Sequence, residues 1–306
     1  HHRIPAFRGG RVQAKLHGLR GNVPSQREIR RRIGSVGNIK QITRAMQFVA
    51  ASKLRRAQDA TLASRPYSDK LDEVLADVAA VVDPETHPLL AEEREGTRLI
   101  VLFTSDRGMA GSLNTNTIRF AAQEIAGSTG GLQVATVGRK GTAAMRRGQV
   151  PLAASFDGFG DKPAFSDILP LARLISDDFL SGTYTKVHLI YPAFVSTLVQ
   201  RPEMKRLLPV KTNPESLEGI PGHQFIFEPS PAQVLEQLMP RYVATRLFQA
   251  VLELTASEQS SRMVAMRNAT DNAQELIDDL TLTYNKVRQS NITREMIEIA
   301  TGASNA

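Results

Sequence analysis

The sequence predicts an α/β protein in which a long antiparallel coiled coil of the N- and C-terminal helices flanks a central α/β domain with a mostly parallel sheet. Three observations predict this fold class. A heptad pattern of apolar residues runs through the last seventy residues, and a second helical pattern occupies the N-terminal part of the chain. Between them, short apolar runs typical of buried strands alternate with helical segments.

The C-terminal pattern, from Pro231 to Thr301, is the most regular in the chain. Sixteen positions follow alternating steps of three and four residues, and twelve of them are apolar or nearly so. No proline follows Pro240, and no glycine lies between Gly222 and Gly302. At about 1.5 Å per residue, such a helix would be roughly 100 Å long. An ordinary bundle helix is the alternative, but its usual length is shorter, and we therefore expect a shaft or strut. The sixteen positions are Leu235, Leu238, Tyr242, Thr245, Gln249, Leu252, Ala256, Gln259, Met263, Met266, Thr270, Ala273, Ile277, Leu280, Tyr284 and Val287.

A second helix is predicted from about Gln26, with Ser25 as its N-cap. Its pattern is less regular, and Gly34 and Gly37 weaken it, so an external partner has to support it. Pro66 is expected to kink or break this helix. Nine arginine and lysine residues lie at positions outside the apolar stripe. The stripe consists of Ile29, Ile33, Val36, Ile39, Ile42, Met46, Val49, Leu54 and Ala57.

The middle of the chain changes period and predicts a Rossmann-like unit, because strands alternate with helices there. The expected strands are Arg98–Phe103, Leu132–Val137, Val150–Phe156 and Lys186–Phe194, and the expected helices are Leu113–Ala126, Lys140–Arg147 and Phe165–Leu180. A loop rich in proline and glycine follows, from Pro209 to Pro231. We expect four regions: a basic leader at 1–25, the N-terminal coiled-coil helix at 26–83, the α/β domain at 84–230 and the C-terminal coiled-coil helix at 231–306.

Composition restricts the possible functions. The chain has 306 residues, 42% of them hydrophobic, and no cysteine, which excludes a disulfide framework and thiolate chemistry. The net charge is +7, but residues 1–59 hold fourteen Lys and Arg against two acids. This basic end could meet nucleic acid, anionic lipid or an acidic protein surface. The leader is expected to be disordered; His1 and His2 resemble a tag remnant, and an organelle transit peptide is the alternative.

A search for catalytic chemistry finds little. The segment Ser105–Ser112 follows a strand and precedes a helix, as a phosphate-binding turn would, but it matches neither G-x-G-x-x-G nor G-x-x-x-x-G-K-[ST]. A tight turn in which Asp106 and Ser112 act as caps is the preferred interpretation. The histidines lack metal-ligand spacing, and the pairs Asp177–Asp178 and Asp278–Asp279 are interpreted as solvated charge. We therefore expect no catalytic, cofactor-binding or metal site.

Three motifs resemble the gamma subunit of F-type ATP synthases. They are Ile29–Ala57 (IRRRIGSVGNIKQITRAMQFVAASKLRRA), Thr104–Asn116 (TSDRGMAGSLNTN) and the C-terminal Ile292–Asn305 (ITREMIEIATGASN), which fits I-T-x-E-x-x-E-x-x-x-G-A. Together they place residues 26–304 in the family's order. Asn305 departs from the small residue usual there, residues 1–25 have no counterpart, and the cysteine pair of redox-regulated photosynthetic versions is absent. The resemblance is therefore to the ordinary bacterial type.

The resemblance implies a non-catalytic central-stalk rotor subunit of the proton-translocating ATP synthase. Its partners would be the alpha and beta subunits of the catalytic ring, the epsilon subunit and the c-subunit ring, at the cytoplasmic face of the bacterial membrane; the mitochondrial matrix side is the other location. The family motifs place rotor–stator contacts at Met46, Arg288, Gln289, Thr293, Glu295 and Glu298. From composition and pattern alone, two other functions stay open: a coiled-coil scaffold that does not rotate, and a basic nucleic-acid-binding protein.

Overall fold

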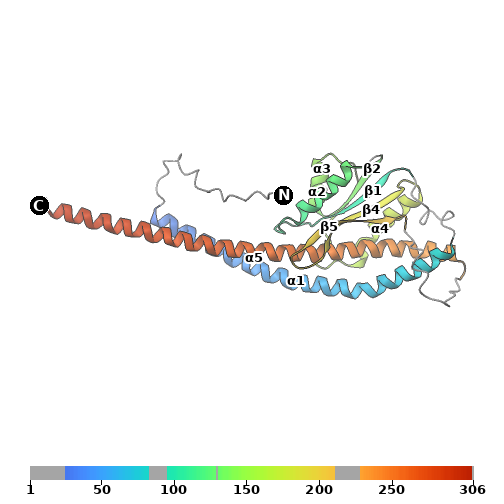
Figure 1. The fold of residues 1–306 in the computed structure, drawn as a ribbon, viewed down its shortest axis with the longest axis horizontal. Coiled ribbons are helices and arrows are strands. Elements are labelled where there is room, and N and C mark those ends of the chain that lie inside the picture. Colours follow the sequence, from blue (N-terminus) through green and yellow to red (C-terminus); the bar gives the residue numbers. More distant parts are fainter. Residues whose placement is uncertain (1–24, 83–94, 129, 211–227, 305–306) are drawn as a thin grey trace, which may run out of the picture. The chain divides into compact units, whose positions relative to one another are not determined.

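The computed structural model describes residues 25–82, 95–128, 130–210 and 228–304. Of these residues, those at 25–40 and 271–304 form one compact unit, and those between 41 and 270 form the other. The expectations for the leader at 1–25, and for most of the loop at 209–231, lie outside the described residues. The elements are α1 Gln26–Val81, β1 Arg98–Phe103, α2 Leu113–Ala126, β2 Leu132–Val137, α3 Arg139–Arg147, β3 Leu152–Phe156, α4 Phe165–Leu180, β4 Lys186–Phe194, β5 Gln200–Leu208 and α5 Pro231–Ser304 (Figure 1).

The two terminal helices are continuous over 56 and 74 residues. Ser25 caps α1 as expected, because its hydroxyl accepts the backbone N–H of Glu28 at 3.3 Å. The expectation that Pro66 could break α1 is wrong, since the helix runs through it to Val81. Packing compensates there: Ser68, Leu71 and Leu75 follow within three turns, and all three are buried. Tertiary burial thus outweighs the local cost of a proline.

The sheet has five strands in the order β3-β2-β1-β4-β5. The first four strands are parallel, and β5 pairs with β4 in the antiparallel sense. The sequence pattern did not predict β5, because its segment QRPEMKRLL carries four charged residues and Pro202. A proline is tolerated in this strand because it lies at the edge of the sheet, where one side needs no ladder bonds.

Alternating side chains along the strands divide the core between the two faces of the sheet. On one face, Ile100 and Leu102 of β1 pack with Ala121 of α2 and Met145 of α3. On the other, Leu99, Val101 and Phe103 belong to a larger cluster that includes α4, α5 and the end of α1. Figure 1 accordingly shows α2 and α3 on one side of the sheet and α4 on the other. A Rossmann-like domain is thus built directly onto the paired terminal helices within residues 41–270.

The heptad seam of α5 is confirmed, since none of its sixteen positions is exposed. The stripe expected on α1 is partly wrong: Ile39, Ile42 and Val49 are 51%, 59% and 53% exposed. A stripe of buried and half-buried positions that runs along α1 to Val82, just beyond its end, instead keeps strict steps of four and three, and polar residues take part in it. These positions are Ile29, Ile33, Val36, Lys40, Thr43, Gln47, Ala50, Leu54, Ala57, Thr61, Ser64, Ser68, Leu71, Leu75, Val78 and Val82.

Polar seam residues explain this difference, because they pair across the two helices. The hydroxyls of Thr43 and Thr270 lie 2.8 Å apart and are buried. In the other compact unit, Lys40 donates to the side chain of Gln274. A polar seam position fixes the register of a coiled coil, because a shifted alignment would leave the buried group unpaired. The direction is antiparallel, since Asp72 accepts from Arg246, far from the Thr43–Thr270 pair.

Candidate functional site

The turn that follows β1 is held by side chains at its own start. The hydroxyl of Ser105 accepts a hydrogen bond from the side-chain amide of Asn114 at 2.8 Å. The backbone N–H of Ser105 donates to Oδ1 of the same side chain at 3.0 Å. Met109 and Gly111 adopt positive φ values of 60° and 55°, which lets the chain reverse before α2. Ser112 occupies the N-cap position of α2, yet within the described residues its hydroxyl accepts Asn116 instead of capping a backbone N–H.

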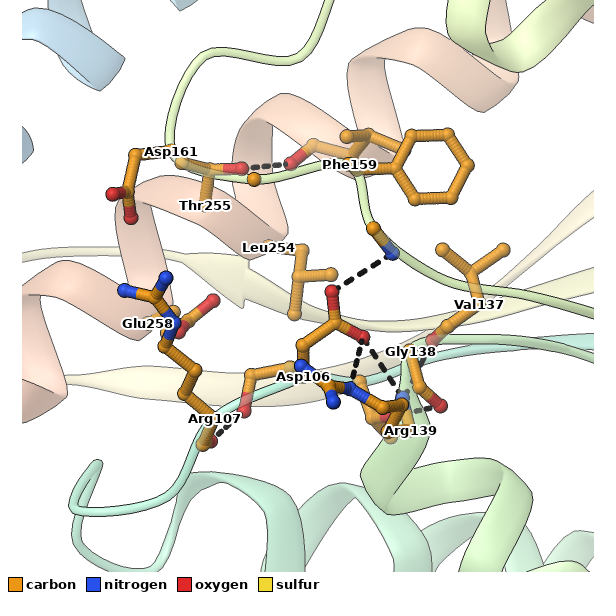
Figure 2. Close-up of a pocket in the computed structure, with 15 residues that line it drawn as sticks. Asp106, Arg107, Val137, Gly138, Arg139, Phe159, Asp161, Leu254, Thr255 and Glu258 are labelled. Atoms are coloured by element: carbon orange, nitrogen blue, oxygen red, sulfur yellow. Dashed lines mark hydrogen bonds and ion pairs between the residues drawn. The ribbon is translucent and has the colours of Figure 1, made fainter.

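Asp106 is the key acceptor of this region, and it caps α3 rather than α2. One carboxylate oxygen accepts the N–H of Arg139, the first residue of α3, and the other accepts the N–H of Gly158, both at 3.0 Å (Figure 2). A carboxylate is favoured at a helix N-terminus by the helix dipole. The N–H groups of Arg139 and Gly158 are therefore engaged by the chain's own carboxylate and are not free to bind a phosphate.

A band of polar residues on α5 contacts the loops at the carboxyl ends of the parallel strands. We call it the polar collar; it consists of Ser257, Gln259, Ser260, Ser261 and Arg262. Except for the half-buried Ser261, its members are at most 8% exposed. The sequence pattern predicted this stretch only as part of the C-terminal helix, with Gln259 in its seam. The run S-E-Q-S-S-R, with no large apolar residue, is the signal that could have indicated polar packing.

The serines of the polar collar bind the end of the β4–β5 hairpin. Ser257 donates to the carbonyl of Pro192 at 2.8 Å, and Ser260 donates to that of Thr197 at 2.6 Å. Ser261 donates to the Gln200 side chain at 2.8 Å. Because Ser257, Ser260 and Ser261 are separated by three and four residues, they lie on one side of α5. The β4–β5 hairpin is therefore bound to one face of α5.

Arg262 adds a contact between α5 and the turn after β1. It donates to the carbonyl of Gly108 at 3.2 Å and pairs with Glu258 at 2.6 Å. Burial raises the pKa of Glu258 above its usual value despite Arg262, and repulsion from Asp161 and Asp106 adds to this effect. The ion pair is nearly dry, with the two side chains 10% and 15% exposed, so removal of either partner would leave an uncompensated buried charge.

Asp161, in the loop after β3, contacts both terminal helices. One oxygen accepts Lys53 of α1 at 2.5 Å, and the other accepts the Gln259 amide of α5 at 3.2 Å. Partial burial acts to raise the pKa of Asp161, but the hydrogen bond and charge of Lys53, with the charges of Arg107 and Arg262, bring it below the usual value. The carboxylate form is thus the one that the structure stabilises.

A small cavity separates these polar groups. Its volume is ≈ 190 Å³, and Asp106, Arg107, Asp161 and Glu258 are among the residues that line it (Figure 2). Ligand pockets are usually larger, at about 300–1,000 Å³. Within the described ranges, His, Asp and Glu side chains form no group of three or more that could hold a metal ion. The hydrogen bonds of Asp106, Asp161 and Arg262 fit a structural junction between the loops and the helices.

The six predicted rotor–stator residues fall in both compact units. Met46 is half-buried on α1 within residues 41–270. The others are exposed on the last third of α5, in the unit that contains residues 271–306; they are Arg288, Gln289, Thr293, Glu295 and Glu298. At 100° per residue these five do not share one face of α5. The described structure thus presents them around the helix and does not gather them into one patch.

An apolar face beside these polar residues was not predicted. Ile292, Met296 and Ile299 are 48%, 65% and 73% exposed, and their spacing of four and three places them on one side of α5. The spacing in I-T-R-E-M-I-E-I could have revealed them, but the sequence interpretation considered polar contacts alone. An exposed apolar stripe of this kind commonly marks a surface that a partner covers.

None of the helices in the described part of the chain combines the length and the apolar character that crossing a bilayer requires. A family model described as ATP synthase matches residues 25–305. An ATP synthase gamma chain of Roseiflexus castenholzii is 49% identical over 288 residues, covering 92% of this chain and 98% of the relative. The chain belongs to the ATP synthase gamma-chain family. As a family member it is a non-catalytic subunit of the central stalk of that complex.

Other comparisons agree with this family membership. A gamma chain of Chloroflexus aurantiacus is 46% identical over 290 residues, covering 92% of this chain and 99% of the relative. A chain from the central stalk and c-ring of the Tetrahymena thermophila mitochondrial ATP synthase is 25% identical, with a TM-score of 0.57, covering 74% of this chain and 99% of that one. A chain from the Euglena gracilis mitochondrial ATP synthase has a TM-score of 0.65 at 21% identity and covers 91% of this chain and 93% of that one, which supports the fold.

Proposed function

We propose that the chain is the rotor of the central stalk and couples proton flow through the membrane sector to conformational cycling of the catalytic beta subunits. The observation that carries this proposal is the match to gamma chains over 92% of the sequence, together with two long helices that pair in the antiparallel sense. A rotor must resist twisting. Paired helices with interlocked polar seam residues do so, because a slip in register would break the Thr43–Thr270 bond.

The proposed rotor is not itself catalytic and affects catalysis in the beta subunits indirectly. Each rotor angle presents a different surface to a beta subunit and favours either its open or its closed form. Changing such an equilibrium from 1:99 to 99:1 requires about 5.5 kcal/mol of differential contact energy. Contacts of this size, distributed over several residues, are strong enough to drive the change. They also stay breakable at each step when the polar ones are individually weak and exposed.

The proposed partners are the alpha and beta subunits of the catalytic ring, the epsilon subunit and the ring of c subunits. Solved chains with the same fold come from ATP synthase rotor and c-ring assemblies, which supports membership of such a complex. The chain would be a peripheral part of the membrane complex. We place it at the cytoplasmic face of a bacterial membrane, since the relatives with 44–49% identity that support the assignment are bacterial.

Within this proposal, Arg288, Gln289, Thr293, Glu295 and Glu298 form the contact of the shaft with the upper part of the catalytic ring. Their exposure on α5 leaves them accessible to a surrounding housing. Ile292, Met296 and Ile299 add an apolar surface between them. Met46 belongs to a second contact, on α1, where the neighbouring Arg44 is exposed and basic.

The proposal is tested by reconstitution. Alpha and beta subunits are mixed with and without the full chain at moderate salt, and ATP hydrolysis is measured. We expect hydrolysis to require the chain and to rise at least tenfold when it is added. A non-rotary scaffold would bind without restoring hydrolysis. A nucleic-acid-binding protein would instead show affinity for DNA or RNA that falls steeply with salt.

Met46→Lys is expected to lower the number of protons pumped per ATP hydrolysed more than it lowers the rate of ATP hydrolysis. The substitution adds a positive charge near Arg44 on a half-buried position of α1, and this charge would strengthen one rotor–stator contact over the others. A single position held about 1.4 kcal/mol too tightly slows its release about tenfold. Proton pumping and ATP hydrolysis are measured in the same vesicles, with Met46→Leu as the control. An unchanged ratio of protons pumped to ATP hydrolysed would remove Met46 from the contact.

A further inference from the structure

Asp161 lies where three parts of the residue 41–270 unit meet. Its loop leaves the carboxyl end of β3, its Oδ2 accepts Lys53 of α1 and its Oδ1 accepts Gln259 of α5. The Lys53 side chain is 22% exposed and that of Asp161 is 34% exposed, so water screens the pair only in part. A single carboxylate therefore connects the α/β domain with both helices at one level.

This position has a mechanical consequence. The polar collar ties the α/β domain to α5 through Ser257, Ser260 and Arg262, whereas Lys53 lies on the other helix. Near this level the two helices touch through Leu54, Ala57 and Ala256, a small apolar cluster. The hydrophobic effect is non-directional, so this apolar cluster does not by itself specify one alignment of the helices. A charge-assisted hydrogen bond is directional and resists sliding.

We propose that Asp161 is a positioning residue that locks the α/β domain to α1 and α5 together, so that the domain and the helix pair transmit torque as one body. This inference rests on the proposed rotor function. Asp161 touches no substrate. It acts by holding the loop after β3 against both helices while opposing forces act on the domain and on the shaft.

The first test uses the isolated full chain and does not depend on rotation. Asp161→Asn retains an amide that can still meet Gln259, but it loses the charge that pairs with Lys53. Amide hydrogen exchange in the peptide that spans residues 157–164 should accelerate at least fivefold, as expected when a coupled contact is lost from a local opening unit. Lys162→Ala, a change at the exposed neighbouring residue, is the matched control and should leave the rate within twofold.

Reversal of the pair separates a positional role from general destabilisation. Lys53→Asp and Asp161→Lys should each accelerate exchange in this loop, and the double variant should recover at least half of the loss. No recovery, together with a uniform rise of exchange over the whole unit, would overturn the proposal, because it would show loss of stability without a specific pair.

The second test measures coupling in reconstituted vesicles. Asp161→Asn is expected to lower protons pumped per ATP hydrolysed at least twofold while leaving hydrolysis within twofold of the wild type, and the charge-reversed double variant should restore the ratio. If wild-type chain fails to support hydrolysis, the rotor function itself fails. If wild type succeeds and Asp161→Asn shows both normal exchange and normal coupling, only the lock is refuted.

Discussion

Gly138→Ala is expected to destabilise the α/β domain by about 4 kcal/mol or more, which is a large part of the 5–15 kcal/mol that typical domains possess. Gly138 has a φ of 98°, where a side chain is strained by about 1–3 kcal/mol. A Cβ built there would lie 1.8 Å from the carbonyl oxygen of Thr104. Relief requires β1 and β2 to separate, although Thr104 donates to Val137 at 2.8 Å. Urea denaturation measures the loss of unfolding free energy, when both proteins are analysed with the same dependence of that free energy on urea concentration.

Gly182→Ala separates the strain from the clash. Gly182 has a similar φ of 80°, but nothing lies within 4 Å of its would-be Cβ. It should therefore cost only about 1–2 kcal/mol, the ordinary penalty for a left-handed non-glycine residue. Equal losses in the two variants would contradict the argument that close approach of the backbones at Thr104 makes glycine necessary at position 138.

Removal of residues 296–306 should weaken assembly with the catalytic ring by about a hundredfold while leaving the α/β domain folded. The described residues of this segment make the end of α5, and Met296, Ile297 and Ile299 are 65%, 57% and 73% exposed. Each such side chain contributes about 1.5–3 kcal/mol when a partner buries it fully. Even partial burial of the three would exceed the roughly 2.7 kcal/mol that a hundredfold change represents. Binding of the truncated chain to alpha and beta subunits measures the effect.

The residues that remain after this truncation provide the control for folding. All three apolar clusters lie between residues 41 and 270, so circular dichroism should lose only the signal of the missing helical turns. Glu295→Gln with Glu298→Gln keeps the length and the apolar face but removes charge, and Met296→Gln with Ile299→Gln does the reverse. Loss of all folded signal in the truncated chain, or wild-type binding to the ring, would contradict the prediction.

Regular periodicity explains why so much of the fold could be predicted. The segments Arg98–Phe103, Leu132–Val137 and Lys186–Phe194 were expected as strands and are strands with the same bounds. Each is a mostly apolar run, because in a parallel sheet covered on both faces every side chain enters a core. The α5 seam was predictable for a related reason: its positions keep one spacing throughout the helix.

Interactions between distant segments explain what could not be predicted. Nothing in α1 alone indicates that Thr43 faces inward while Ile42 is 59% exposed; the reason is Thr270, more than two hundred residues away. The polar collar has the same character, since Ser257 is recognisable as a structural residue only beside the carbonyl of Pro192. The six proposed rotor–stator contacts stay predictions, because their partners belong to other chains.

The carboxylate of Asp106 has a consequence for anion binding at the carboxyl ends of the parallel strands. A parallel sheet with a helix beginning at the end of a strand ordinarily offers its free amides to a soluble anion. Here the amides of Arg139 and Gly158 hold an anion that is covalently part of the chain. A soluble phosphate would therefore have to displace Asp106 before it could accept from these two amides.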